Sequence, residues 1–204
     1  MKRRLQGHEA NGKTLEKLDL RNMSAFQSKW RGCSFAQCTM GLSFFKGSVF
    51  GGTSLSACDM PLCDFSGAII DGTSFSGCVM DQSSFAGAIL TDVTYTACQL
   101  SLSSFSGATL RKVRFLDCNL YGVDLDILEG KGNEFRGNNM WGTRIPNNCQ
   151  FWNSSVDDKT CRMFVGLVAR VMGDMADKEA LIEIAGHEYT LVDRLMSVEE
   201  EGSE

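Results

Sequence analysis

The sequence predicts an all-β fold in which the chain winds into a parallel solenoid with four-sided coils, followed by an α-helical C-terminal segment. Three observations predict the solenoid: large apolar residues recur every five positions, small residues recur two places before them, and identical residues recur every twenty. A helix would place its apolar residues three and four apart, and a half-buried strand would alternate them. Neither has a period of five, so a coil with regular corners is required.

The spacing of five runs from Leu20 to Ile145. Of the 26 positions in this range whose numbers are multiples of five, all but Ala25 and Gly130 carry a large apolar side chain. The positions two residues earlier, from Cys33 to Ala108, are all small or, once, valine. A coil that turns one large and one small side chain inward per five residues changes direction every five residues, so four such units close a square.

The period of twenty supports this square. Phenylalanine recurs every twenty residues from 45 to 105, methionine from 40 to 80 and cysteine from 38 to 118. Identical residues stacked along one axis are typical of a solenoid, whose coils hydrogen-bond to their neighbours as parallel ladders.

The units SFSGC, SFAGA and SFSGA at residues 74–78, 84–88 and 104–108 resemble those of the pentapeptide repeat family. This resemblance covers roughly residues 18 to 150 and implies a right-handed quadrilateral β-helix of pentapeptide repeats. At about 4.8 Å per coil, six and a half coils make a rod roughly 30 Å long. We assign residues 18–152 to this β-helix, residues 1–17 to an N-terminal arm or cap, and residues 153–204 to an α-helical cap or dimerisation segment.

The chain has nine cysteines, seven of them at the small inward position: Cys33, Cys38, Cys58, Cys63, Cys78, Cys98 and Cys118. Their spacing is that of the repeat itself, and a free cysteine behaves as a small buried hydrophobe. We therefore expect core filling rather than zinc binding. No apolar stretch follows the N-terminal MKRR, so we expect no secretory signal, reduced cysteines and a cytoplasmic protein.

The repeat weakens at residues 126–133, where Leu128 is too large for the small position and Gly130 leaves the large position empty. A bulge or short loop is expected there. Asn133 and Asn138 then take small positions, and an open solenoid end needs a cap to cover its core and its unpaired ladder groups.

Residues 157–199 have helical periodicity instead. One apolar stripe comprises Phe164, Leu167, Val168, Val171, Met172 and Met175. A second helix is expected after Asp177, carrying Leu181, Ile184 and Ala185, and a third from Thr190, carrying Leu191, Val192, Leu195 and Met196. These helices are short, so they must pack on the end of the rod or on a second subunit, and we expect a homodimer.

The outer surface carries the candidate partner-binding residues. No lysine or arginine lies between Lys46 and Arg111, whereas this region contains Asp59, Asp64, Asp71, Asp81 and Asp92. Two apolar columns are also expected to point outward, Val49 with Ile69 and Ile89, and Leu42 with Leu62 and Leu102. Exposed apolar columns of this extent indicate a contact surface, although flat strand faces also tolerate such residues.

Catalysis is the least favoured function. The only histidines are His8, in the N-terminal arm, and His187, in the tail, and no phosphate-binding loop is present. No cofactor, metal or direct nucleic-acid contact is expected.

Two binding functions stay open. Some pentapeptide repeat proteins are DNA-shaped dimers that engage gyrase, so the resemblance implies a DNA mimic that modulates gyrase, another topoisomerase or a phage or bacterial defence enzyme. The alternative is a scaffold or effector that binds a protein partner through its apolar columns and its tail. Fold alone does not decide between them.

Overall fold

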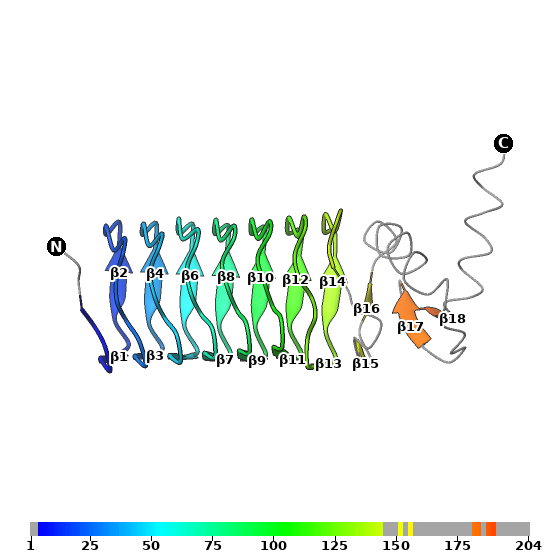
Figure 1. Cartoon of the computed structure of the whole chain (residues 1–204), viewed down its shortest axis with the longest axis horizontal. Coiled ribbons are helices and arrows are strands. Elements are labelled where there is room, and N and C mark those ends of the chain that lie inside the picture. Colours follow the sequence, from blue (N-terminus) through cyan, green and yellow to red (C-terminus); the bar gives the residue numbers. More distant parts are fainter. Residues whose placement is uncertain (1–3, 145–150, 153–154, 157–180, 185–186, 191–204) are drawn as a thin grey trace.

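The computed structural model describes residues 4–144, 151–152, 155–156, 181–184 and 187–190, with side chains at residues 4–144. Its main body is a straight stack of coils with short strands on two sides (Figure 1). The strands of one side are β1 (Glu9–Asn11), β3 (Lys29–Arg31), β5 (Val49–Gly51), β7 (Ile69–Asp71), β9 (Ile89–Thr91), β11 (Thr109–Arg111), β13 (Glu129–Lys131) and β15 (Phe151–Trp152). Those of the other are β2 (Thr14–Glu16), β4 (Ser34–Ala36), β6 (Ser54–Ser56), β8 (Ser74–Ser76), β10 (Thr94–Thr96), β12 (Arg114–Leu116), β14 (Glu134–Arg136) and β16 (Ser155–Val156).

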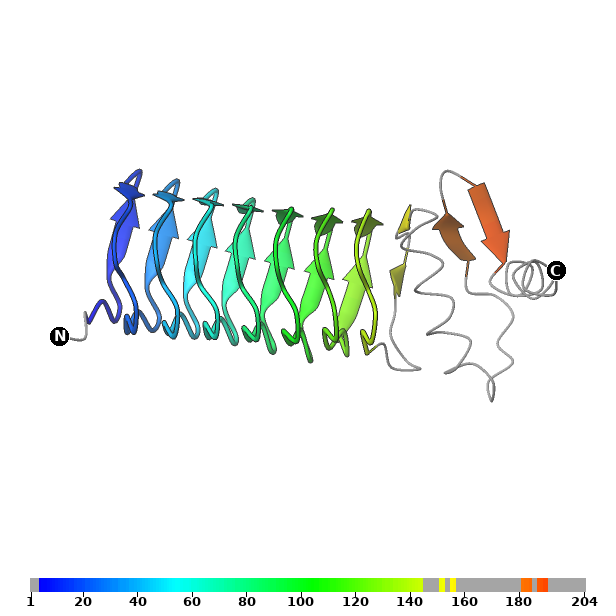
Figure 2. The same cartoon turned by 90° about the horizontal axis from the view of Figure 1, so that it is seen from above.

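Each strand from β1 to β12 pairs in parallel with the strand twenty residues further along the chain. Ala10 lies beside Trp30, for example, and Phe75 beside Tyr95. The remaining two sides are held by single parallel bridges with the same offset, such as Asp59 to Val79 and Asp64 to Ser84. The fold is therefore a right-handed quadrilateral β-helix, as predicted, and Figure 2 shows its coils stacked along one axis.

The coils begin before the predicted boundary at residue 18. Strands β1 and β2 join the two sheets by pairing with β3 and β4, so residues 9–16 belong to the first coil of the solenoid.

The core consists of stacked aromatic side chains. Rings of Phe45, Phe65, Phe85 and Phe105 follow one another at centroid distances of 5.0, 5.0 and 4.7 Å. A second column, Phe75, Tyr95, Phe115 and Phe135, has spacings of 4.8, 5.0 and 5.1 Å. Full burial of each ring contributes about 1.5–3 kcal/mol, so these two columns account for much of the stability of the rod.

Tyr95 is the exception in this core. Its side chain is fully buried, and its hydroxyl has no hydrogen-bond partner among the residues that the structure describes. Burial raises the pKa of this phenol well above its usual value. A buried polar group without a partner destabilises the folded state.

The small inward residues connect successive coils through their side chains. Ser48 Oγ donates a hydrogen bond to the carbonyl oxygen of Ala25 at 2.8 Å, and Ser103 Oγ donates to that of Met80 at 2.9 Å. Near the C-terminal end of the rod, Asn138 accepts from the backbone N–H of Cys118 and donates to the carbonyl oxygen of Phe115, both at 2.8 Å. A serine hydroxyl and an asparagine amide therefore both satisfy backbone groups from the interior, so asparagine can take the small position in the last coils.

The corners lie two residues after each large inward residue. From Gly7 to Gly142 every such position has a positive φ except Ile127. At this exception the predicted irregularity is present: Leu128 turns outward and is 73% exposed, whereas Ile127 is buried. The offset of twenty is kept, because Thr109 still pairs with Glu129.

The C-terminal segment differs from the prediction where the structure describes it. Leu181 and Ile184, expected on a second helix, lie in strand β17 (Leu181–Ile184), which pairs with β16 and, antiparallel, with β18 (His187–Thr190). The β-branched Ile182 and Ile184 favour a strand over a helix. The first predicted helix lies outside the described residues, as does the third beyond Thr190. Among the residues described, none belongs to a helix with the length and hydropathy of a membrane span.

Candidate protein-interaction surface

The first candidate surface is the sheet-face ridge, which we define as Val49, Ile69 and Ile89 on strands β5, β7 and β9. These residues are direct neighbours in adjacent coils. Ile69 and Ile89 are 47% and 43% exposed, and Val49 is half-buried. The same column ends in ion pairs, Lys29 with Glu9 on one side and Glu129 with Arg111 on the other.

The second is the corner ridge, which we define as Leu42, Leu62 and Leu102. All three side chains are about half exposed, at 48%, 46% and 56%, and Gln82 stands between Leu62 and Leu102. Each of the three has a φ of 58–59°, in the left-handed region that favours glycine. A leucine there costs roughly 1–2 kcal/mol in backbone conformation. Local conformational preference therefore does not account for the leucines at this corner.

The five candidate aspartates divide between two parts of the rod surface. Asp59, Asp64 and Asp81 lie on the two bridged sides that meet at the corner ridge, whereas Asp71 ends strand β7 and Asp92 follows β9. Asp64 and Asp81 each accept one backbone hydrogen bond, from the N–H of Ser66 at 2.9 Å and of Ser101 at 2.8 Å. The sequence predicts the residues but not this division, which follows from the side of the square on which each one falls.

The aspartates beside the corner ridge form no ion pair in the part of the chain that the structure describes, although Asp59 is near enough to Arg21 to interact with it electrostatically. Within the described residues no ion pair involves Asp59, Asp64 or Asp81. Ion pairs do occur further along the same two sides, Arg21 with Asp19 near one end and Arg144 with Asp124 near the other. The unpaired negative charge beside the corner ridge therefore lies in the middle of the rod.

Four further exposed apolar residues on these two sides were not predicted as surface candidates. Val79 is 36% exposed, Phe44 38%, Tyr121 51% and Trp141 69%. Tyr121 and Trp141 are twenty residues apart in one outward column, and Phe44 stacks on Phe26 at 5.7 Å. These four exposed residues could have been found from the sequence, because the repeat of twenty aligns every outward column and not only the two most regular ones.

No metal-binding cluster lies on the described part of these surfaces. The structure, over its described residues, contains no group of histidine, cysteine or carboxylate side chains suited to a metal ion. The seven cysteines of the small inward position are buried and unbridged, and burial raises the pKa of Cys63 to about 12. An enclosed thiol that stays protonated, as Cys63 does, is a poor nucleophile and a poor metal ligand.

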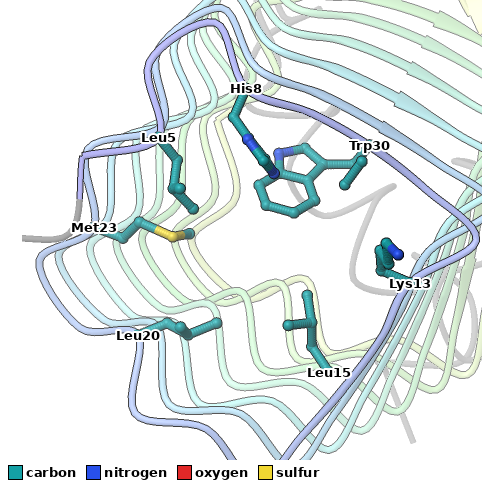
Figure 3. Close-up of a pocket in the computed structure, with 8 residues that line it drawn as sticks. Leu5, His8, Lys13, Leu15, Leu20, Met23 and Trp30 are labelled. Atoms are coloured by element: carbon teal, nitrogen blue, oxygen red, sulfur yellow. The ribbon is translucent and has the colours of Figure 1, made fainter.

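A hollow of about 200 Å³ lies at the N-terminal end of the rod (Figure 3). It is lined by Leu5, His8, Ala10, Lys13, Leu15, Leu20, Met23 and Trp30. His8 faces the Trp30 ring at 5.9 Å, and no carboxylate is among the described residues that line the hollow. It is also distant from the acidic middle of the rod.

The twenty-residue offset, the five-residue sides and the filled interior define a solenoid of pentapeptide units. A family model described as pentapeptide repeat region matches residues 50–125 and 68–145. The repeat region of this chain, residues 50–145, belongs to the pentapeptide repeat family. No curated protein sequence matches it.

The chain is similar to several solved structures at low sequence identity. A trypsin-treated variant of QnrB1, a plasmid-mediated fluoroquinolone resistance protein, is 14% identical and has a TM-score of 0.41, covering 79% of this chain and 97% of its own. HetL, involved in heterocyst differentiation regulation in the cyanobacterium Nostoc, is 15% identical with a TM-score of 0.35, covering 74% and 86%. Rfr23 of the cyanobacterium Cyanothece is 10% identical with a TM-score of 0.29, covering 71% and 87%.

The candidate dimer residues cannot be placed on this surface. Phe164, Leu167, Val168, Val171, Met172, Met175, Leu191 and Leu195 lie outside the described residues.

Proposed function

We propose that this chain is a non-enzymatic protein-binding module that imitates duplex DNA and modulates a DNA-processing enzyme, with gyrase as the first target to test. The observation that carries this proposal is the acidic middle of the rod, where five aspartates occur with no lysine or arginine between Lys46 and Arg111. Four of the five form no ion pair within the described part of the chain, and three of these, Asp59, Asp64 and Asp81, lie beside the corner ridge.

The dimensions of the rod fit this role. Eight strands in one sheet make seven intervals. At about 4.8 Å each they extend roughly 34 Å, which is about one helical turn of DNA. A homodimer formed through residues 153–204 would set two such rods in line, and we propose this arrangement as well.

The charge density is lower than that of DNA. Residues 47–110 form about three coils, or roughly 14 Å, over which a duplex carries about eight phosphate charges. The rod carries five carboxylates there. One of the five, Asp92, pairs with Lys112 at 3.9 Å. The unpaired negative charge of the rod is therefore about half of that on the duplex, and other contacts have to contribute.

Supercoiling of relaxed plasmid by the gyrase holoenzyme, with increasing amounts of the full chain, tests the proposal. We expect the extent of supercoiling to change with the protein concentration, and the effect to weaken when Asp59, Asp64 and Asp81 are all replaced by Asn. Unchanged supercoiling at a large molar excess of protein would exclude gyrase as the target.

A scaffold that binds a partner without imitating DNA is the second candidate. The corner ridge favours it, because its half-exposed leucines suit an apolar contact with another protein. The salt dependence of the interaction separates the two. Binding by a DNA mimic should fall steeply as the salt concentration rises, whereas binding through leucines should change little.

A further inference from the structure

The corner ridge is the part of the surface that folding explains least. The same corner carries Gly122 and Gly142 in later coils, and glycine is the residue best suited to its positive φ. Leu42, Leu62 and Leu102 keep the unfavourable backbone conformation and leave about half of their side chains exposed. The buried half of each side chain contributes some stability, but the unfavourable backbone conformation offsets it, and the exposed half does not favour solubility.

The apolar surface continues beyond the leucines along the rod. The Leu102 side chain leans over the next coil, since a Cβ on Gly122 would lie 2.7 Å from Leu102 Cδ2. Tyr121 and Trp141 follow in the adjacent column, at 51% and 69% exposure. From Leu42 to Trp141 this surface crosses five coil intervals, or roughly 24 Å.

An α-helix laid along the corner ridge matches its repeat. The side chains on one face of a helix recur with a pitch of about 5.4 Å, close to the spacing of about 4.8 Å between coils. A helix of about 16 residues spans 24 Å. The two spacings differ by about 0.6 Å per turn, an offset of roughly 3 Å over five intervals. Successive turns can therefore meet the leucines of neighbouring coils, and the flexibility of long side chains takes up the offset at the ends of the surface.

Charge decides which kind of helix fits. Asp59 and Asp81 lie on one side of the corner ridge and Asp64 on the other, and none of them forms an ion pair within the described residues. A helix with a leucine-rich face bordered by lysines or arginines would supply the missing cations on both sides.

The same charges argue against occupants from this chain. A second copy packed ridge to ridge would bring these aspartates against each other. The C-terminal segment, residues 151–204, carries twelve acidic residues against five basic ones, so it too would be repelled.

We infer that the corner ridge is a docking surface for an amphipathic, basic α-helix of a partner protein. This inference rests on the proposed protein-binding role, but it does not require the partner to be gyrase. The sheet-face ridge takes no part in this contact, because the charged residues at the ends of its column already form ion pairs.

The probe is a synthetic 16-residue helical peptide with leucine on one face and lysine along both borders. The control peptide keeps every lysine and has serine in place of leucine. Fluorescence anisotropy with the full chain should show binding of the leucine peptide at least about tenfold tighter than that of the serine peptide. Equal affinities would mean that charge alone drives binding, which would overturn the inference.

Matched variants locate the contact. Leu62→Gly combined with Leu102→Gly should weaken peptide binding roughly tenfold or more, with the thermal midpoint unchanged or raised because glycine suits the corner. Ile69→Thr combined with Ile89→Thr on the sheet-face ridge should leave the affinity unchanged. The inference fails if the leucine variant binds as the wild type does, or if the isoleucine variant loses as much.

Two further measurements keep the outcomes distinct. If the leucine variant does not fold, Asp59→Asn combined with Asp81→Asn is used instead and should weaken binding at low salt. A dimer that light scattering finds in the wild type and not in Leu62→Gly would identify a second copy as the occupant and overturn the inference. Peptide binding without any effect on gyrase would retain the inference and exclude gyrase, so the two proposals can fail separately.

Discussion

Replacing Tyr95 with phenylalanine should stabilise the protein. The Tyr95 ring is stacked between Phe75 and Phe115 at 4.8 and 5.0 Å, and a phenylalanine ring fills the same place. The hydroxyl is fully buried and has no partner in the described structure, so its removal relieves an unsatisfied polar group, a cost of about 1–3 kcal/mol. The dispersion attraction of the single oxygen atom that is removed is worth only a few tenths of a kcal/mol.

The expected net gain is therefore about 1 kcal/mol, which raises the thermal midpoint of a chain of this length by roughly 2–4 °C. Differential scanning calorimetry at neutral pH measures this change. The matched control is Phe75→Tyr, which adds a hydroxyl one coil away in the same stack and should lower the midpoint by a similar or larger amount. A lower midpoint for Tyr95→Phe would show that the hydroxyl has a partner and that the reasoning about this core is wrong.

The assignment of inward and outward positions is tested on strand β8 by urea unfolding. Phe75→Asp buries a charge and should lower the free energy of unfolding by at least about 4 kcal/mol, whereas the exposed Ser76→Asp should be nearly neutral. Equal losses would refute the assignment. Burial raises the pKa of Cys63 to about 12. Above the ordinary pKa of a thiol, the unfolded chain therefore releases a proton that the folded protein keeps. The contribution of Cys63 to the free energy of unfolding should be constant near neutral pH and fall from about pH 9 towards 12. Near pH 10 this one thiol contributes a loss of about 1.3 kcal/mol per pH unit, and denaturant titrations of Cys63→Ala should show a decline shallower by that amount; an identical decline contradicts the assignment of a buried thiol. Light scattering should find a dimer for the full chain and a monomer for a truncation after Asp158, and a monomeric full chain at micromolar concentration would reject the dimer.

The fold of the rod could be predicted in detail because each coil repeats the same local rule. A large residue such as Phe85 and a small residue such as Ser83 each point inward, and the offset of twenty fixes their neighbours. Even the irregularity near Leu128 follows from two residues that break this rule. The predicted start of the solenoid is too late, because Ala10 and Leu15 continue the spacing of five more weakly than the later aromatic residues do.

The C-terminal segment could not be predicted in the same way. Leu181 and Ile184 are three residues apart and suit a helical stripe, but Ile182 and Ile184 also suit a strand, and the exposed edge of β16 offers a strand its hydrogen-bond partners. Pairing with an existing sheet edge is a tertiary effect that local periodicity does not contain.

The candidate surface was predicted only in part. The composition identifies the aspartates and the two apolar ridges, but not that Asp59, Asp64 and Asp81 border one ridge while Asp71 and Asp92 lie elsewhere. That grouping depends on the side of the square each residue occupies, which can be worked out from the repeat only once the corners are known. The positive φ of Leu62 and Leu102 needs the structure, since most corner positions carry glycine or polar residues.

Displacement of duplex DNA from gyrase tests the central claim most directly. A fluorescent duplex is bound to the gyrase holoenzyme, and the unlabelled full chain is added while anisotropy is recorded. If the rod imitates duplex DNA, the protein should release the duplex in proportion to its concentration, and the variant in which Asp59, Asp64 and Asp81 are replaced by Asn should need a several-fold higher concentration. A duplex that stays fully bound at saturating protein would contradict the claim that this chain occupies the DNA-binding surface of gyrase.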